Sequence, residues 1–295
     1  MGHGPRGESL TRQIQVNLDS KLAIGQSKAF HQMCNGGKSD KIHSWNTYRT
    51  YMKHANYFTN WCKENYGCKT LEQCRPHVNE WLESRSNLSP YTQKLESSAL
   101  AKVYDCKTTD FRPTPERARA DITRSRNPVS MDKHFSTAKN ADFVDFCKST
   151  GLRRSELKAL TGDKLVMKNG EPYIRVDSGV KGGRVREAPV IGNKQKVMDM
   201  MSRAGSGKVF DRIPSKADIH SYRAEYASEV YRQHARPYEQ IPYDRITRGG
   251  HQIKSGVYHC RGDKSGTWLD KDAMRVASNA LGHDRLSVIA GHYIR

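Results

Sequence analysis

Residues 281–293 read LGHDRLSVIAGHY, and the tyrosine that closes this stretch, Tyr293, decides how the rest of the sequence is interpreted. A tyrosine hydroxyl, with a pKa of ~10, is a weak nucleophile at neutral pH. Covalent chemistry on a phosphodiester therefore requires a base, an acid and cations around the developing negative charge. The chain offers these groups in four residues that lie far upstream: Arg153, Lys181, His220 and Arg223.

Three stretches hold these residues: GLRRSEL at 151–157, GVKGGRVREAPV at 179–190 and HSYR at 220–223. An arginine presents a fixed fork of donors that matches two phosphate oxygens and stays charged. A lysine ammonium can donate a proton to a leaving oxygen, and an imidazole titrates near neutral pH. Each residue taken singly is more often a surface side chain. Their joint occurrence, in this order, favours one shared site.

In this order the four stretches resemble the catalytic motifs of the tyrosine recombinase (phage integrase) family, as in integrases of phages and conjugative transposons. The resemblance implies a site-specific recombinase that cleaves and rejoins DNA through a 3′-phosphotyrosyl intermediate, without a metal or nucleotide cofactor. It implies double-stranded DNA as the partner, bound by a homotetramer on two paired sites. The catalytic residues that it implies are Arg153, Lys181, His220, Arg223, His283 and Tyr293.

The resemblance also implies a role for each residue. Tyr293 would be the nucleophile, His220 would assist removal of its proton, and Lys181 would protonate the departing 5′-oxygen. Arg184 lies three residues after Lys181 and competes with it for the role of acid. Cations and hydrogen-bond donors would stabilise the charged phosphate, and these are Arg153, Arg223 and His283, with Glu156 holding Arg153 in place.

Two other functions fit the same residues. A type IB-like topoisomerase shares this chemistry but relaxes DNA as a monomer without joining two sites. A DNA-binding accessory protein would keep the fold and the basic charge without cleaving DNA. The presence of every matched residue favours the recombinase.

The composition supports a polyanion as partner. Fifty Lys and Arg residues against thirty-one Asp and Glu leave a formal charge of +19 on 295 residues, enough for two ordinary domains. No apolar run approaches the ~18 residues of a membrane span, and the first ten residues contain no apolar signal segment. The seven cysteines form no Cys-x-x-Cys pair, so we expect reduced thiols in a cytoplasmic, DNA-associated protein; they are at positions 34, 62, 68, 74, 106, 147 and 260.

Residues 1–106 are expected to form an N-terminal helical bundle that resembles the core-binding domain of the family. A loosely attached first helix is expected within residues 11–34, and Ser44 opens a stronger one that ends at Gly67. A third helix follows at 71–82, and Ser89-Pro90 starts a fourth. Residues 107–133, rich in proline and basic side chains, are predicted to be the linker.

Residues 134–295 are expected to form the catalytic domain, which gives a mainly α fold with a small antiparallel three-stranded sheet. Asn169-Gly170 predicts a hairpin between two strands, and a third strand follows at 185–191. A helix at 217–233 places His220 and Arg223 on one face. Another begins at Asp270 and stops at Gly282.

Residues 233–268 read as an inserted loop or hairpin, because glycines and prolines recur through the segment. His251, His259 and Cys260 raise the question of a metal site, but they lack a fourth ligand at a recognised spacing. We expect no metal here.

Overall fold

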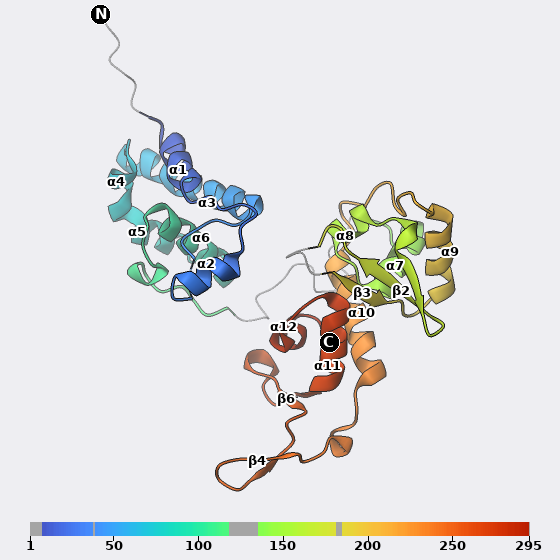
Figure 1. Ribbon diagram of the computed structural model, residues 1–295. Coiled ribbons are helices and arrows are strands. Elements are labelled where there is room, and N and C mark those ends of the chain that lie inside the picture. Colours follow the sequence, from blue (N-terminus) through green and yellow to red (C-terminus); the bar gives the residue numbers. More distant parts are fainter. Residues whose placement is uncertain (1–7, 38, 118–134, 181–184, 295) are drawn as a thin grey trace, which may run out of the picture. The chain divides into compact units, whose positions relative to one another are not determined.

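The computed structural model describes residues 8–37, 39–117, 135–180 and 185–294 (Figure 1). The chain divides into two compact units, residues 1–121 and 122–295. Helices dominate both units, and the described sheets are small and antiparallel, which confirms the predicted fold class. Within the described ranges, no helix combines the length and the apolar content that crossing a membrane requires.

The first unit is a bundle of helices whose starts follow the predicted caps. Ser44 and Ser89 each accept a hydrogen bond from the backbone N–H three residues on, and Pro90 occupies the first position of its helix. Phe58, Trp81 and Leu100 fill part of the core. The helices are α1 (Leu10–Asp19), α2 (Lys28–Cys34), α3 (Trp45–Tyr66), α4 (Leu71–Cys74), α5 (Val78–Ser84) and α6 (Pro90–Val103).

The start of this unit differs from the expected loosely attached helix at 11–34. The chain forms two helices there, and α1 is firmly held, because Ile14 and Leu18 are fully buried in a cluster with Ile42 and Ala55. A parallel bridge between Leu22 and Ile42 separates α1 from α2. The sequence pattern looks weak because the residues that complete this apolar face come from other parts of the unit.

Part of the predicted linker packs on the first unit. Phe111 lies against the cluster that contains Phe58 and Trp81, and the backbone N–H of Arg112 donates to Oδ1 of Asn79 at 2.8 Å. The remainder of the linker, from residue 118 onward, lies outside the described residues.

The second unit places a small sheet among helices. β1 (Leu165–Lys168), β2 (Glu171–Val176) and β3 (Arg186–Pro189) are antiparallel in the order β1-β2-β3. Asn169 and Gly170 both have positive φ, so the predicted hairpin turn is confirmed. The helices are α7 (Ala141–Thr150), α8 (Arg154–Ala159), α9 (Lys194–Ala204), α10 (Ile219–His234), α11 (Lys271–Leu281) and α12 (Leu286–His292).

The inserted segment between α10 and α11 contains two antiparallel pairs of short strands, which agrees with the predicted hairpin character. The first pair is β4 (Arg245–Ile246) with β5 (Gln252–Ile253), and the second is β6 (Val257–His259) with β7 (Trp268–Asp270). Among the described residues, no group of three His, Cys, Asp or Glu side chains is arranged to hold a metal ion.

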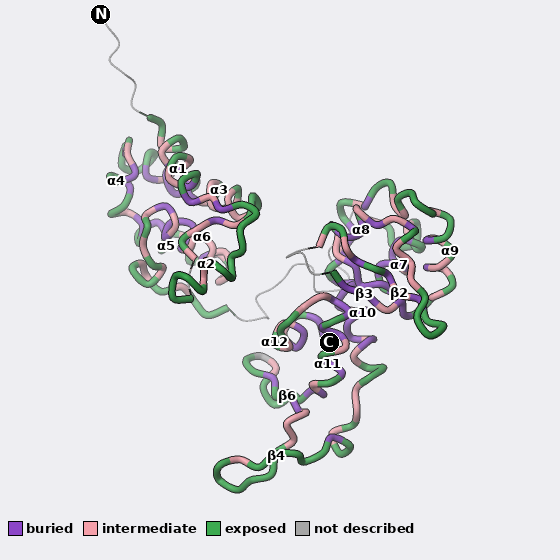
Figure 2. Tube along the Cα trace, viewed as in Figure 1, coloured by how far each residue is buried: buried purple, intermediate pink, exposed green. Residues whose placement is uncertain are grey.

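The second unit contains two clusters of buried hydrophobic residues. Figure 2 colours the buried positions along the chain purple. Phe146, Leu157 and Ile174 belong to the cluster around the sheet, α7 and α9. Tyr226 and Leu281 belong to the cluster among α10, α11 and α12. Helix α10 borders both clusters, and its first turns carry His220 and Arg223.

Candidate active site

Arg153 stands at the N-cap of α8, directly after the α7 terminus. Gly151 ends α7 with φ +60, and a Cβ there would lie 2.2 Å from Cδ1 of Tyr226, so only glycine fits this junction. The backbone N–H of Arg153 donates to Oε2 of Glu156 at 2.7 Å, and Nη1 of Arg153 donates to Oε1 at 2.7 Å. The Arg153 side chain is 19% exposed, so its guanidinium is oriented by a buried carboxylate while part of it still faces solvent.

Arg186, to which the sequence motifs assign no role, is the second partner of Glu156. Its Nη1 and Nη2 donate to Oε1 and Oε2 of Glu156 at 2.9 and 2.8 Å, and its Nε donates to the carbonyl oxygen of Ala280 at 2.9 Å. Burial alone would raise the pKa of Glu156, but the hydrogen bonds and charge of Arg186, followed by the hydrogen bonds of Arg153, lower that pKa to about 2. Glu156 is therefore ionised and links α8, β3 and the end of α11.

Arg223 lies deep between the segments that carry the other candidate residues. It is 1% exposed and donates to the carbonyl oxygens of Gly151 and Leu281. Burial, followed by the charge of Arg153, lowers the pKa of Arg223 to about 10, and Tyr293 acts in the opposite direction. Arg223 thus remains protonated at neutral pH and ties the ends of α7 and α11 to α10.

His283 follows Gly282, which ends α11 in the left-handed conformation. Nη2 of Arg153 lies 3.5 Å from Nε2 of His283. Burial, followed by the charges of Arg223, Arg153 and Arg186, lowers the pKa of His283 to about 4. The imidazole is therefore neutral at pH 7, and it can offer a hydrogen bond but no charge.

Tyr293 ends α12 and is 6% exposed. Its ring centroid is 5.2 Å from that of His283 and 6.5 Å from that of His220, and Cζ of Arg223 lies 5.6 Å from it. The carbonyl oxygen of Tyr293 accepts a hydrogen bond from Oγ of Ser228 at 3.1 Å, which fixes α12 against α10.

The structure thus gathers Arg153, His220, Arg223, His283 and Tyr293 from separate parts of the chain. Lys181 and its competitor Arg184 lie outside the described residues. The segment just before them is anchored beside Arg153, because Oγ of Ser155 donates to the carbonyl oxygen of Gly179 at 2.8 Å.

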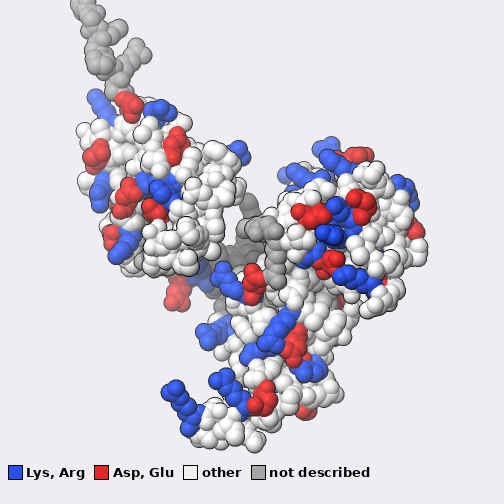
Figure 3. Space-filling view, viewed as in Figure 1, with Lys and Arg blue, Asp and Glu red and all other residues white. Residues whose placement is uncertain are grey.

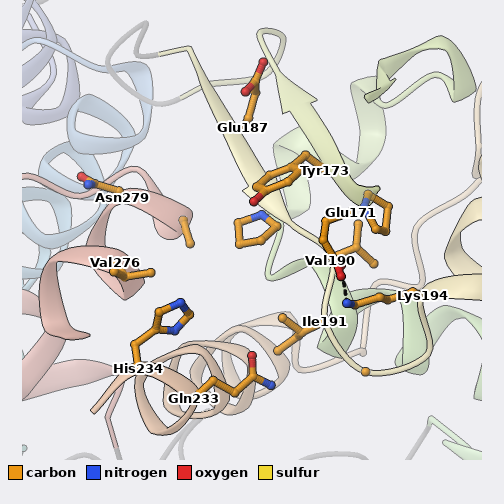
Figure 4. A pocket seen from close by; sticks show the side chains of 14 residues that line it. Glu171, Tyr173, Glu187, Val190, Ile191, Lys194, Gln233, His234, Val276 and Asn279 are labelled. Atoms are coloured by element: carbon orange, nitrogen blue, oxygen red, sulfur yellow. Dashed lines mark hydrogen bonds and ion pairs between the residues drawn. The ribbon is translucent and has the colours of Figure 1, made fainter. Parts of the chain in front are cut away.

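A cavity of about 480 Å³ lies between the sheet and the facing parts of α10 and α11 (Figure 4). Tyr173 lines it from the sheet, and His234 and Asn279 line it from the helices. An ion pair between Lys194 and Glu171 closes one side. None of the described candidate residues lines this cavity.

Neither a protein-family model nor a curated protein sequence matches the chain. Solved structures share its fold. The Tn1549 transposon integrase in complex with transposon right end DNA aligns with a TM-score of 0.51 and 11% identity, covering 98% of this chain and 95% of that one. XerH site-specific recombinase bound to palindromic difH substrate aligns with a TM-score of 0.51 and 14% identity, covering 97% of this chain and 90% of that one. At these identities the likeness establishes a common fold.

Proposed function

We propose that this protein is a site-specific DNA recombinase that cleaves and rejoins DNA through a phosphotyrosyl bond at Tyr293. The observation that carries the proposal is the assembly of two arginines and two histidines around one tyrosine, from three separate stretches of the chain. The fold supports it, because two structures that share this fold are DNA-bound complexes of a transposon integrase and a site-specific recombinase.

The proposed reaction is a transesterification. The Tyr293 oxygen attacks the phosphorus, the bond between phosphorus and the 5′-oxygen breaks, and the DNA 3′-phosphate becomes esterified to the tyrosine. His220 assists removal of the tyrosine proton, and the departing 5′-oxygen gains a proton from Lys181. Attack by the 5′-hydroxyl of a second strand reverses the step, so that strands are exchanged without a consumed cofactor.

Charge stabilisation in this scheme comes from the arginines. Arg153 and Arg223 supply two permanent cations to the pentacovalent phosphate, and His283 contributes a hydrogen bond because its imidazole is neutral. Arg223 is 1% exposed, and its Cζ lies 5.6 Å from the Tyr293 ring centroid. A phosphate can therefore reach Arg223 only if side chains that cover it move, and we propose that DNA binding drives this movement.

The proposed assembly is a homotetramer that holds two DNA sites, since strand exchange requires four cleavage events on paired duplexes. A monomer that only relaxed supercoiled DNA would do the same chemistry without exchanging strands. The two activities separate in one assay, in which relaxation is scored on a plasmid with one site and recombination on a plasmid with two.

The deciding experiment replaces Tyr293. Nicked duplexes drawn from the DNA that flanks the gene are incubated with the wild-type protein, with Tyr293→Phe and with a matched control, Tyr258→Phe. The control also loses one hydroxyl from the second unit. EDTA is present throughout. Covalent protein–DNA adducts that survive detergent are expected for the wild type and for Tyr258→Phe, and none for Tyr293→Phe, with noncovalent binding nearly unchanged because no charge is removed. An adduct formed by Tyr293→Phe at the wild-type level would refute Tyr293 as the nucleophile.

A further inference from the structure

The first strand pair of the inserted segment projects from the second unit (Figure 1). We call residues 243–254 the ribbon: β4 and β5 are paired through Arg245 with Ile253 and Ile246 with Gln252, and all four residues are exposed. The ribbon contributes nothing to the candidate active site. A two-stranded ribbon exposed on both faces is marginally stable alone, so its persistence requires support from its base.

The base of the ribbon is held firmly. Oδ1 of Asp244 accepts a hydrogen bond from the backbone N–H of Ser255 at 2.8 Å. Nζ of Lys254 lies 4.4 and 4.8 Å from the ring centroids of Tyr238 and Tyr243 and donates to the Tyr238 carbonyl oxygen at 2.7 Å. These contacts fix the direction in which the tip points, so the ribbon is an ordered projection.

The tip combines apolar and cationic side chains. Ile246 is 65% exposed, and the exposed arginines Arg245 and Arg248 form no ion pair within the described parts of the chain. No acidic residue occurs between positions 245 and 262. In Figure 3 this end of the second unit carries basic side chains at its tip. An exposed isoleucine beside arginines without an ion pair suits a binding partner that has a groove. The walls of such a groove would be anionic, and its floor would offer apolar contacts.

Duplex DNA provides such a surface, and a second copy of this chain does not. Each copy carries a formal charge of +19, so a cationic tip would meet a cationic partner. A DNA groove has phosphates along both walls, and the major groove, about 12 Å wide, admits a two-stranded ribbon. Arg245 and Ile246 fall on opposite faces of the ribbon, because successive side chains alternate, so both faces present a contact.

We propose that the ribbon enters a groove of duplex DNA outside the segment bound at the candidate active site, with Arg245 and Arg248 on phosphates and Ile246 against the base edges or sugars. This inference rests on the proposed function, since it assumes that the protein binds duplex DNA. It adds a second contact with DNA, which lengthens the bound site.

The test compares Arg245→Ala/Arg248→Ala with the wild type and with the matched control Arg203→Ala/Arg212→Ala, which removes two exposed arginines elsewhere in the same unit. Binding to a long random-sequence duplex is measured as a function of salt. The ribbon variant is expected to bind roughly tenfold more weakly or worse at physiological salt, with a slope of log affinity against log salt reduced by about 1.8, or 0.9 for each lost phosphate contact. On the duplex that gives covalent trapping, hydroxyl-radical protection of the flanking base pairs should disappear, while the adduct yield on a duplex shortened to the remaining protected region stays at the wild-type level.

Unchanged protection and an unchanged salt slope in the ribbon variant, with the wild type binding and trapping DNA, would overturn the ribbon's role and leave the proposed function standing. Equal losses in the ribbon variant and the arginine control would also overturn it, because they would reflect general charge. A change in the sedimentation of the DNA-free variant would assign the ribbon to contact between copies and contradict the inference. If the wild type itself bound no duplex, the proposed function would fail first.

Discussion

Glu156 is the carboxylate on which the mutual positions of the candidate catalytic groups depend. It is 2% exposed, yet it carries a charge, because Arg153 and Arg186 both donate to it. Arg186 also donates to the carbonyl oxygen of Ala280, three residues before His283. A buried network of hydrogen bonds therefore connects the segment that carries Arg153 to the segment that carries His283.

Arg186→Met should break this network. The change leaves Glu156 buried with one cation where it had two, and breaking a buried ion pair costs about 3–5 kcal/mol. We expect a lower Tm, a cleavage rate reduced by at least tenfold, and little change in DNA affinity, because Arg186 is 8% exposed. Thermal unfolding and single-turnover cleavage measure the two effects.

A double variant separates positioning from stability. Glu156→Leu/Arg186→Met removes both buried charges and should recover much of the lost stability. Cleavage should stay slow, because Arg153 has lost the carboxylate that orients it. Wild-type cleavage by the double variant would show that Arg186 only stabilises the fold.

His283 should make folding sensitive to pH between about 6.5 and 4. Its folded-state pKa of about 4 lies below the ordinary value of 6.5, so the unfolded chain binds a proton in this window that the folded chain does not. Stability is then full above pH 6.5 and falls as the pH drops towards 4. The groups that face His283 are Arg223, Arg153, Arg186, Glu156 and Tyr293.

The control for this titration is His283→Gln. Urea unfolding of both proteins at several pH values should give a steeper loss of stability for the wild type between pH 6.5 and 4.5, a range above the ordinary pKa of the carboxylates. Parallel curves for the two proteins would mean that His283 keeps an ordinary pKa.

The glycine that ends α11 allows Arg186 to lie close to the backbone just before His283. Gly282 has φ +67, and a Cβ added there would lie 2.9 Å from Cδ of Arg186, whose guanidinium is already fixed by Glu156 and Ala280. Gly67 at the end of α3 has φ +65 with nothing within 4 Å, so it is a matched control. Gly67→Ala should cost only the strain of a left-handed alanine, about 1 kcal/mol, and leave cleavage unchanged.

Gly282→Ala should cost more than Gly67→Ala and should slow cleavage as well, because His283 follows directly. Urea unfolding and single-turnover cleavage on both variants test this. Equal stability losses with normal cleavage in both would show that Arg186 yields to the added methyl group.

Elements with strong local signals could be predicted from the sequence. Asn169-Gly170 has the backbone preference of a tight hairpin, and Ser44 and Ser89 cap helices, so these boundaries were correct. The helix that carries His220 and Arg223 followed from periodicity. The packing of α1 depends on residues that are distant in the sequence. Ile14 is buried by Ile42 and by residues of other helices, and no local sequence pattern indicates such partners.

In the candidate site, too, residues with a local sequence signal could be predicted, and residues that depend on a distant partner could not. The motifs named the residues that gather around Tyr293, because each lies in a short stretch with a chemical meaning of its own. Arg186 could not be found that way, since its partner Glu156 lies 30 residues away. The available signal was an arginine that alternates with Ala188 on the inward face of a strand, where a buried acid has to meet it.

The charge of the whole chain bears on how both units would hold DNA. The formal charge is +19, and on the face that Figure 3 shows, basic side chains occur over both units and are mixed with acids. A protein that grips DNA with many separate lysines and arginines releases a counterion at each phosphate contact. Binding should then respond to salt more strongly than to any single substitution.

The affinity of the wild type for duplex DNA is therefore expected to fall by about 10³–10⁵-fold between ~50 and ~200 mM salt, as for six to ten phosphate contacts. Tyr293→Phe should give the same slope, because it removes no charge, whereas each arginine that touches a phosphate should lower the slope by about 0.9 when replaced by alanine. Fluorescence anisotropy on one random-sequence duplex measures all of these. An affinity that changed less than about tenfold over this range would rule out an extended electrostatic grip, and DNA would then be held by few contacts.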